Sequence, residues 1–103
     1  MKLVSKKGIL RIAIDRAENL ETWTLYGSLS GEMVDEFAVT WKNTRTERME
    51  REWVIDLTEV ISIDERGEQM LMQAMRTGAR FVVRGVYSTN LVESLSARYK
   101  QEA

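Results

Sequence analysis

Acidic side chains crowd one short stretch of the sequence, directly after a short apolar run at residues 53–55. Asp56 closes that run, Glu59 follows three residues later, and Asp64 and Glu65 end the stretch. If the run is a strand of a parallel sheet, these carboxylates lie near its carboxyl end, where α/β proteins place ligands. Paired carboxylates there could bind a divalent cation or act as a general acid and a general base.

The composition argues against most of that chemistry. The chain of 103 residues has no cysteine and no histidine, which excludes thiol nucleophiles, disulfides and Ser-His triads and removes the commonest zinc ligand. The segment around Asp64 also lacks the glycine spacing of a phosphate-binding loop. We therefore favour a structural and partner-docking role for the acidic residues, and we expect no catalytic residue, no metal and no cofactor.

The bulk composition limits the partners as well. Lys plus Arg number 15 against 16 for Asp plus Glu, so no basic stripe is available for nucleic acid. No apolar run reaches membrane-spanning length, and the apolar part of the N-terminus is too short for a signal peptide. We expect one cytoplasmic domain over residues 1–103, with a core at about 10–99 and with neither nucleic acid nor membrane as a partner.

The acidic stretch is expected to join a buried strand to a helix. The apolar run at residues 53–55 predicts the strand, and residues 57–63 predict a shaped loop with apolar anchors at Val60, Ile61 and Ile63. Asp64 is an N-cap candidate for the following helix, since its carboxylate can accept from free N–H groups of the first turn.

Two features of the next turn support that helix start. Glu65 and Glu68 place negative charge where the helix dipole favours it. Gly67 is costly inside a first turn unless another part of the backbone must approach closely there. The helix then continues to a stop at Gly78.

The rest of the chain supplies the elements that this unit packs against. Residues 1–8 are a basic, weakly patterned lead-in, and residues 43–52 are expected to be a solvated helix end and loop. Period-two alternation predicts strands at 9–15 and 22–26, and a short apolar run predicts one at 81–83. Helical spacing predicts helices at about 31–45, capped by Ser30, and from the cap candidates Ser88, Thr89 and Asn90 to about 99. The expected fold is α/β, with a mixed, largely parallel four-stranded sheet in the order β-β-α-β-α-β-α and helices mainly on one face.

Two residue types invite other interpretations. The three tryptophans, Trp23, Trp41 and Trp53, fall on inward positions of the expected elements, so core packing is favoured over ligand stacking. Met72 points away from the apolar stripe of its helix, and we expect it to be exposed as an adaptable contact.

The central residues resemble a known family. Asp56-Leu57-x-x-Val60-x-x-Ile63-Asp64-x-x-Gly67, followed by a helix, Gly78 and Ala79-Arg80-Phe81-Val82-Val83, is similar to the STAS domain. This is the fold of anti-sigma factor antagonists and of the cytoplasmic tails of sulfate transporters. Leu25-x-Gly27-x-Leu29 also matches its usual second strand. The resemblance implies a small mixed sheet and a regulatory binding module, not an enzyme.

The sequence departs from this family at the regulatory position. In the antagonists, a Ser or Thr just after the motif aspartate is phosphorylated by an anti-sigma kinase, and the phosphate blocks docking. Glu65 and Arg66 occupy those positions here, so the phospho-switch does not carry over. Glu65 either supplies a fixed charge in place of phosphate or only favours the helix start; we favour the second interpretation.

We therefore expect a non-catalytic, STAS-like protein-interaction module of bacterial regulation, with an anti-sigma kinase-like or other signalling protein as partner. One alternative is a module that binds a small ligand or nucleotide at the carboxyl ends of the strands, and another is a scaffold subunit or homodimer that uses its edge strand. The expected docking residues are Thr58, Glu59, Ser62, Asp64, Glu65, Arg66, Gly67, Glu68 and Met72.

Overall fold

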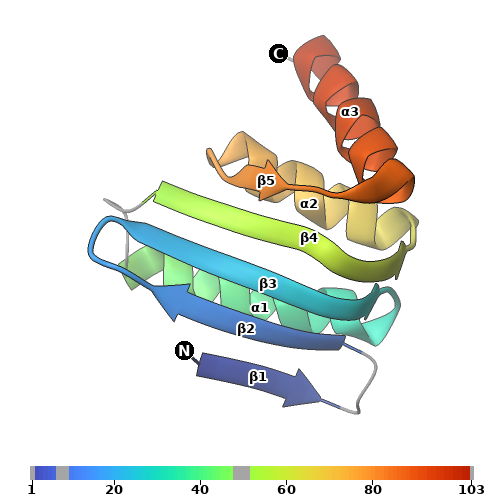
Figure 1. Cartoon of the computed structure of the whole chain (residues 1–103). Coiled ribbons are helices and arrows are strands. Elements are labelled where there is room, and N and C mark those ends of the chain that lie inside the picture. Colours follow the sequence, from blue (N-terminus) through green and yellow to red (C-terminus); the bar gives the residue numbers. More distant parts are fainter. Residues whose placement is uncertain (1, 7–9, 48–51, 103) are drawn as a thin grey trace.

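The computed structural model describes residues 2–6, 10–47 and 52–102, and the side chains of residues 10–43 and 52–101. Its sheet lies in front of two helices in Figure 1, and a third helix rises beyond one edge of the sheet. The elements in chain order are β1 (Lys2–Lys6), β2 (Leu10–Arg16), β3 (Leu20–Leu29), α1 (Glu32–Glu47), β4 (Glu52–Ile63), α2 (Glu65–Arg76), β5 (Arg80–Val82) and α3 (Gly85–Glu102).

The sheet order follows the chain, β1-β2-β3-β4-β5. β1 with β2 and β2 with β3 are antiparallel, whereas β3 with β4 and β4 with β5 are parallel. The mixed α/β fold and the four expected strands, which are β2 to β5, are confirmed. β1 is an additional strand in the segment expected to be an unpatterned lead-in, and it makes the sheet evenly mixed. It was missed because edge pairing uses backbone groups and needs no alternating side chains.

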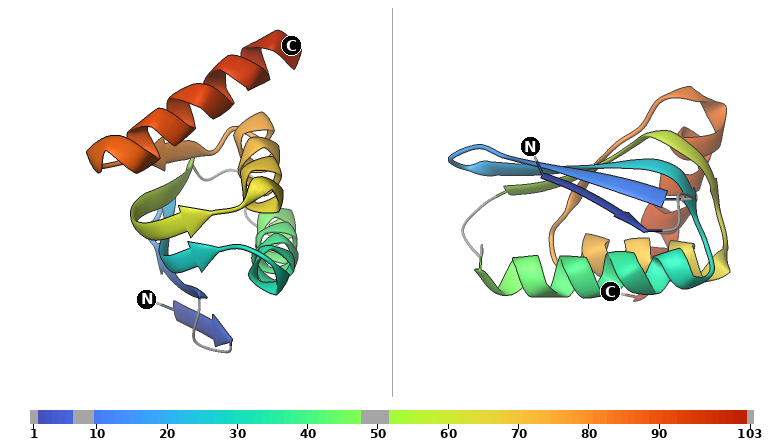
Figure 2. Two further views of the ribbon diagram at one scale, coloured as in Figure 1. Left: turned by 90° about the vertical axis from the view of Figure 1, so that its right-hand side faces the viewer. Right: turned by 90° about the horizontal axis from the view of Figure 1, so that it is seen from below.

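The helices cover one face of the sheet. Figure 2 shows α1 and α2 side by side on the same face, while α3 crosses the β5 edge. The core lies beneath α1 and α2, and its aromatic part is a row of edge-to-face rings. The centroids of Trp23 and Trp41 are 5.0 Å apart, and those of Trp41 and Trp53 are 4.6 Å apart. The inward placement of all three tryptophans is therefore confirmed.

β4 is much longer than expected. It continues to Ile63, so the prediction of a loop over residues 57–63 was wrong. Two register shifts against β3 each insert one extra residue into β4. Such bulges reverse the side-chain alternation locally, which is why the polar segment did not look like a strand. Val60 packs against the core, but Ile61 is 77% exposed and is not the anchor we expected.

The ends of two helices also differ from expectation. α3 begins at Gly85, before the expected caps, and the Ser88 hydroxyl instead bonds the backbone N–H and carbonyl of Arg84. The predicted solvated segment at 43–52 falls partly on residues 48–51, which lie outside the described residues.

Candidate functional site

A single carboxylate joins the starts of two helices. Asp64, the N-cap of α2, accepts from the backbone N–H of Gly67 at 2.8 Å through Oδ1. Its other oxygen, Oδ2, accepts from the backbone N–H of Gly31 at 2.9 Å, just before α1. The predicted cap is thus confirmed, and the same side chain satisfies a free donor of each helix start. The expected Ser30 cap is not formed, because the Ser30 hydroxyl has no hydrogen bond with another described residue.

Gly67 allows this junction to be tight. A Cβ atom at position 67 would lie 2.5 Å from the carbonyl oxygen of Leu29 and 2.7 Å from Cγ2 of Ile63. Both distances are shorter than van der Waals contact, so the first turn of α2 can rest on the end of β3 only with glycine here. The backbone N–H of Asp64 donates to the same Leu29 carbonyl at 3.2 Å. The close approach inferred from Gly67 is therefore confirmed.

The hydrogen bonds at Asp64 also set its ionisation. Backbone N–H groups of Gly31 and then Gly67 donate to the carboxylate, and the nearby Arg66 guanidinium adds a smaller favourable charge. Together these outweigh the effect of burial and hold the pKa of Asp64 below its ordinary value of 3.8. The group that joins the helices is therefore a carboxylate at neutral pH.

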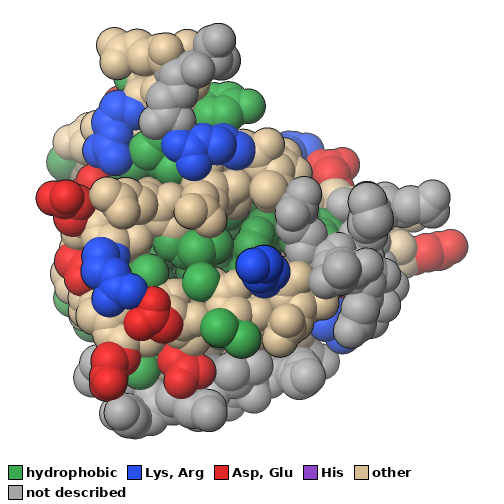
Figure 3. All heavy atoms as spheres, turned by 180° about the vertical axis from the view of Figure 1, so that it is seen from behind, with side chains coloured by type: hydrophobic (Ala, Val, Ile, Leu, Met, Phe, Trp, Pro, Cys, Tyr) green, Lys and Arg blue, Asp and Glu red, His purple; other side chains and the backbone are tan. Residues whose placement is uncertain are grey.

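Three exposed charged side chains surround this junction. Arg66 of α2 reaches Asp35 of α1, with Nη2 2.5 Å from Oδ1, and the two side chains are 56% and 64% exposed. Glu65, the first residue of α2, is exposed and interacts with no other described side chain. We call Asp35, Glu65 and Arg66 the helix-start surface. Figure 3 shows acidic and basic side chains close together at the end of the molecule where α1 and α2 begin.

Ser62 lies near this surface, at the end of β4. Its hydroxyl is 2.9 Å from that of Ser28, at the end of β3, and both groups are accessible. The next residue, Ile63, donates its backbone N–H to the Tyr87 hydroxyl of α3 at 2.8 Å. Ser28, Tyr87 and Asp35 were missed because they lie on other elements, and no local pattern links them to Asp64.

Two expected docking residues lie farther back along β4. Thr58 is half-buried, and its backbone N–H donates to Oδ1 of Asp56 at 2.9 Å. Glu59 is exposed on the strand. Because β4 is extended, both lie well away from the first turn of α2. They therefore are not part of the helix-start surface.

Two further expected docking residues face α3. Glu68 pairs with Arg98 at 3.1 Å, and its side chain is 27% exposed. Met72 is only 3% exposed, and its sulfur accepts from Nη2 of Arg98 at 3.4 Å. The expectation that Met72 is exposed was wrong, since α3 packs against the flank of α2 that carries Met72.

The acidic stretch does not converge on a metal site in the part of the chain that the structure describes. No group of three or more Asp and Glu side chains there could hold a metal ion. The Asp56 carboxylate accepts a hydrogen bond within its own strand, and the Asp64 carboxylate accepts hydrogen bonds at the helix starts. No described helix combines the length and apolar character needed to cross a bilayer.

Comparisons with known proteins agree with the architecture. No family model and no curated protein matches the sequence.

An anti-sigma factor antagonist from Mycobacterium paratuberculosis superposes with a TM-score of 0.69 at 16% identity, over 88% of this chain and 86% of its own. The STAS domain of an antisigma-factor antagonist from Rhodobacter sphaeroides gives 0.60 at 17% identity, over 78% and 90%. An uncharacterised protein with a SpoIIAA-like fold from Shewanella loihica gives 0.56 at 15% identity, over 84% and 76%. The chain therefore has the fold of the STAS domains of anti-sigma factor antagonists.

Proposed function

We propose that this chain is a non-catalytic protein-interaction module of bacterial regulation, with residues 1–103 forming one cytoplasmic STAS-like domain. The fold likeness to anti-sigma factor antagonists supports a regulatory class. The partner is then a signalling protein, for which an anti-sigma kinase-like protein is the first candidate.

The observation that carries the proposal is the contrast between a fixed backbone and a free side chain. Asp64 and Gly67 hold the first turn of α2 against β3 and α1. Glu65 projects from that turn, exposed and without an interaction to another described side chain. A rigid turn that presents an unpaired charge loses little conformational entropy when a partner binds.

The helix-start surface suits a partner with its own mixed charges. Asp35 and Arg66 already neutralise each other across the two helices, so Glu65 is the charge that a partner must match. A carboxylate has less charge and fewer acceptor oxygens than phosphate. Glu65 therefore imitates a phosphorylated residue only in part, if the fixed-charge interpretation holds.

Site-directed photo-crosslinking tests the docking position. A photoreactive amino acid at position 65 should capture one protein from an extract of the cells that naturally make this chain. The matched control carries it at Gln73, an exposed position of the same helix. Equal capture at both positions, or none at position 65, would contradict docking at the helix-start surface.

The captured partner then separates the two interpretations of Glu65. If the side chain acts as a fixed charge, Glu65→Ala and Glu65→Ser both change the affinity for that partner by about fivefold or more. If it only favours the helix start, the affinity stays constant and the unfolding free energy falls by about 0.5 kcal/mol. A saturable thermal stabilisation by nucleotides or Mg²⁺ would instead support the alternative of a ligand at the strand ends.

A further inference from the structure

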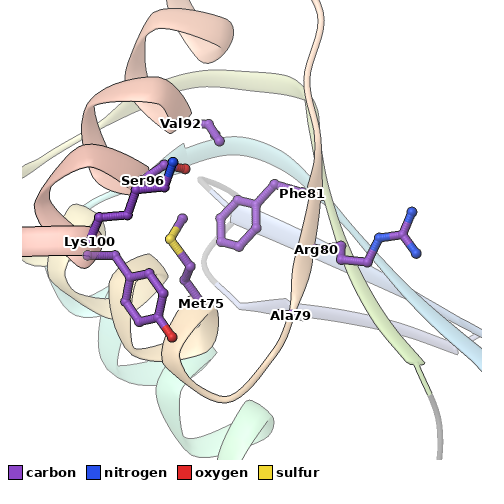
Figure 4. Close-up of a pocket in the computed structure, with 8 residues that line it drawn as sticks. Met75, Ala79, Arg80, Phe81, Val92, Ser96 and Lys100 are labelled. Atoms are coloured by element: carbon purple, nitrogen blue, oxygen red, sulfur yellow. The ribbon is translucent and has the colours of Figure 1, made fainter. Parts of the chain in front are cut away.

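A cavity of about 430 Å³ lies at the opposite end of the sheet from the helix-start surface. It is shallow and open to solvent, and it is bordered by the end of α2, by β5 and by the second half of α3, as Figure 4 shows. Cavities of this size commonly hold small molecules.

The walls of the cavity are mainly apolar and incompletely covered. Four half-exposed side chains of the walls pack against the core on one side: Met75, Phe81, Val92 and Tyr99. Figure 4 shows Met75 and Phe81 on either side of the opening, from different elements. These side chains leave apolar surface in water, so an apolar group that entered would gain free energy by covering it.

One side of the cavity is polar and cationic. Ser96 and Lys100 are four residues apart on α3 and share a helix face, and Figure 4 shows the Lys100 side chain extending toward Ser96. Neither side chain makes a hydrogen bond or an ion pair with another described residue. Arg80 points away from the opening and is paired with Glu52. Among the described residues no acidic side chain lines the cavity, so Lys100 is a cation with an apolar neighbourhood and a hydroxyl beside it.

We propose that this cavity binds a small amphipathic monocarboxylate, with a medium-length alkyl chain against the apolar walls and its carboxylate on Lys100 and Ser96. The alkyl chain of the ligand would lie along the apolar walls, which come from α2, β5 and α3. Its single carboxylate would face the one ammonium group without a partner among the described lining residues, that of Lys100. This site is independent of the proposed function, since it shares no residue with the helix-start surface.

Titration calorimetry with octanoate tests the site, with 1-octanol and butyrate as comparators. Removing the charge from the ligand should weaken binding about tenfold, as expected for loss of a charged hydrogen bond. Shortening the chain by four methylene groups should weaken it about 100-fold or more. Amide chemical shifts should change around Phe81 and Ser96 and stay constant around Glu65.

Two variants tie the binding to this cavity. Lys100→Met keeps the apolar stem, and it should weaken octanoate about tenfold while leaving 1-octanol unchanged. Lys42→Met is the matched control on α1, which contributes no lining residue. Val92→Trp should fill the cavity and abolish binding of both ligands, with circular dichroism to verify folding.

Any of three affinity results would overturn the proposal, and so would one chemical-shift result. The affinity results are the absence of saturable octanoate binding, equal affinity for octanoate and 1-octanol, and equal octanoate affinity in the Lys100→Met and Lys42→Met variants. Shifts that cluster around Glu65 in place of Phe81 would also contradict it. The three affinity results do not bear on docking at the helix-start surface, which the photo-crosslinking experiment tests separately.

Discussion

The carbonyl oxygen of Leu29 lies 2.5 Å from the point where a Cβ atom on Gly67 would stand. The neighbour is backbone at the end of β3, so it cannot move aside as a flexible side chain would. The other close atom, Cγ2 of Ile63, belongs to a buried side chain. The first turn of α2 therefore depends on glycine for its position.

Gly67→Ala should lower the free energy of unfolding by about 2 kcal/mol. Overpacking against a fixed neighbour costs about 1–3 kcal/mol, which outweighs the gain of up to about 1 kcal/mol from the better helix propensity of alanine. Urea denaturation measures the difference. Gln69→Ala, at an exposed position of the same helix, should change stability by less than about 0.5 kcal/mol. A Gly67→Ala protein as stable as this control would contradict the close contact.

Asp64→Ala should lower the unfolding free energy by about 2 kcal/mol, and Asp64→Asn by about 1 kcal/mol. Asparagine is a good N-cap, so its carbonyl oxygen can keep the bond to Gly67. Its amide group cannot accept from the N–H of Gly31, so the second helix start loses its partner. If the asparagine variant matched the wild type, the bond to Gly31 would contribute nothing.

The stability advantage of the wild type over Asp64→Asn should depend on pH. The folded-state pKa of Asp64 lies below 3.8, so the ionised form favours the folded state. That contribution is complete above the unfolded-state pKa and is lost as the pH falls through the folded-state pKa. Denaturation of both proteins between about pH 7 and pH 2 should therefore give a difference that is constant above about pH 5 and shrinks below it. A difference that grew on acidification would contradict the hydrogen bonds at Asp64.

A double-mutant cycle with Arg66→Ala and Asp35→Ala should give a coupling free energy of about 0.5 kcal/mol. The distance is short, at 2.5 Å, but both side chains are more than half exposed. Water and salt weaken exposed ion pairs to about 0.2–1 kcal/mol. The coupling should shrink further in about 0.5 M salt, where the Debye length is roughly half of its value at physiological ionic strength. A coupling above about 2 kcal/mol would indicate a desolvated pair.

Met72→Ala should lower the unfolding free energy by about 2–3 kcal/mol, as truncation of a buried methionine does. The side chain is 3% exposed beneath α3. Gln73→Ala, the adjacent exposed position, is the control and should have little effect. A change in Met72→Ala as small as in the control would restore the earlier expectation of an exposed contact residue.

The sequence contained enough local information for the order of the elements. Period-two alternation marked β2 and β3, and the apolar stripe with Gly78 marked α2, because each pattern depends only on nearby residues. Asp64 and Gly67 were informative for the same reason: a cap and a first-turn glycine carry their meaning within one helical turn.

The errors at the site itself lie where distant elements meet. β4 was cut short because its bulges turn Val60 and Ile63 toward the core three positions apart, which breaks the period-two alternation of a regular strand. Met72 was predicted to be exposed because the apolar stripe of α2 indicates only the side that faces the sheet. The helix is in fact covered on a second side, by α3. The bond from Asp64 to Gly31 spans 33 residues, so no local pattern could reveal it.

The shared carboxylate makes the two helix starts one cooperative unit. When the hydrogen bond from the Gly31 N–H to Asp64 breaks, the Asp64 carboxylate loses one of the two bonds that fix its orientation. Its remaining bond to the Gly67 N–H is then weakened too. Fluctuations that expose one of these amides to solvent should therefore expose the other. In native-state hydrogen exchange, Gly31 and Gly67 should exchange with the same opening free energy, although they lie at the starts of different helices.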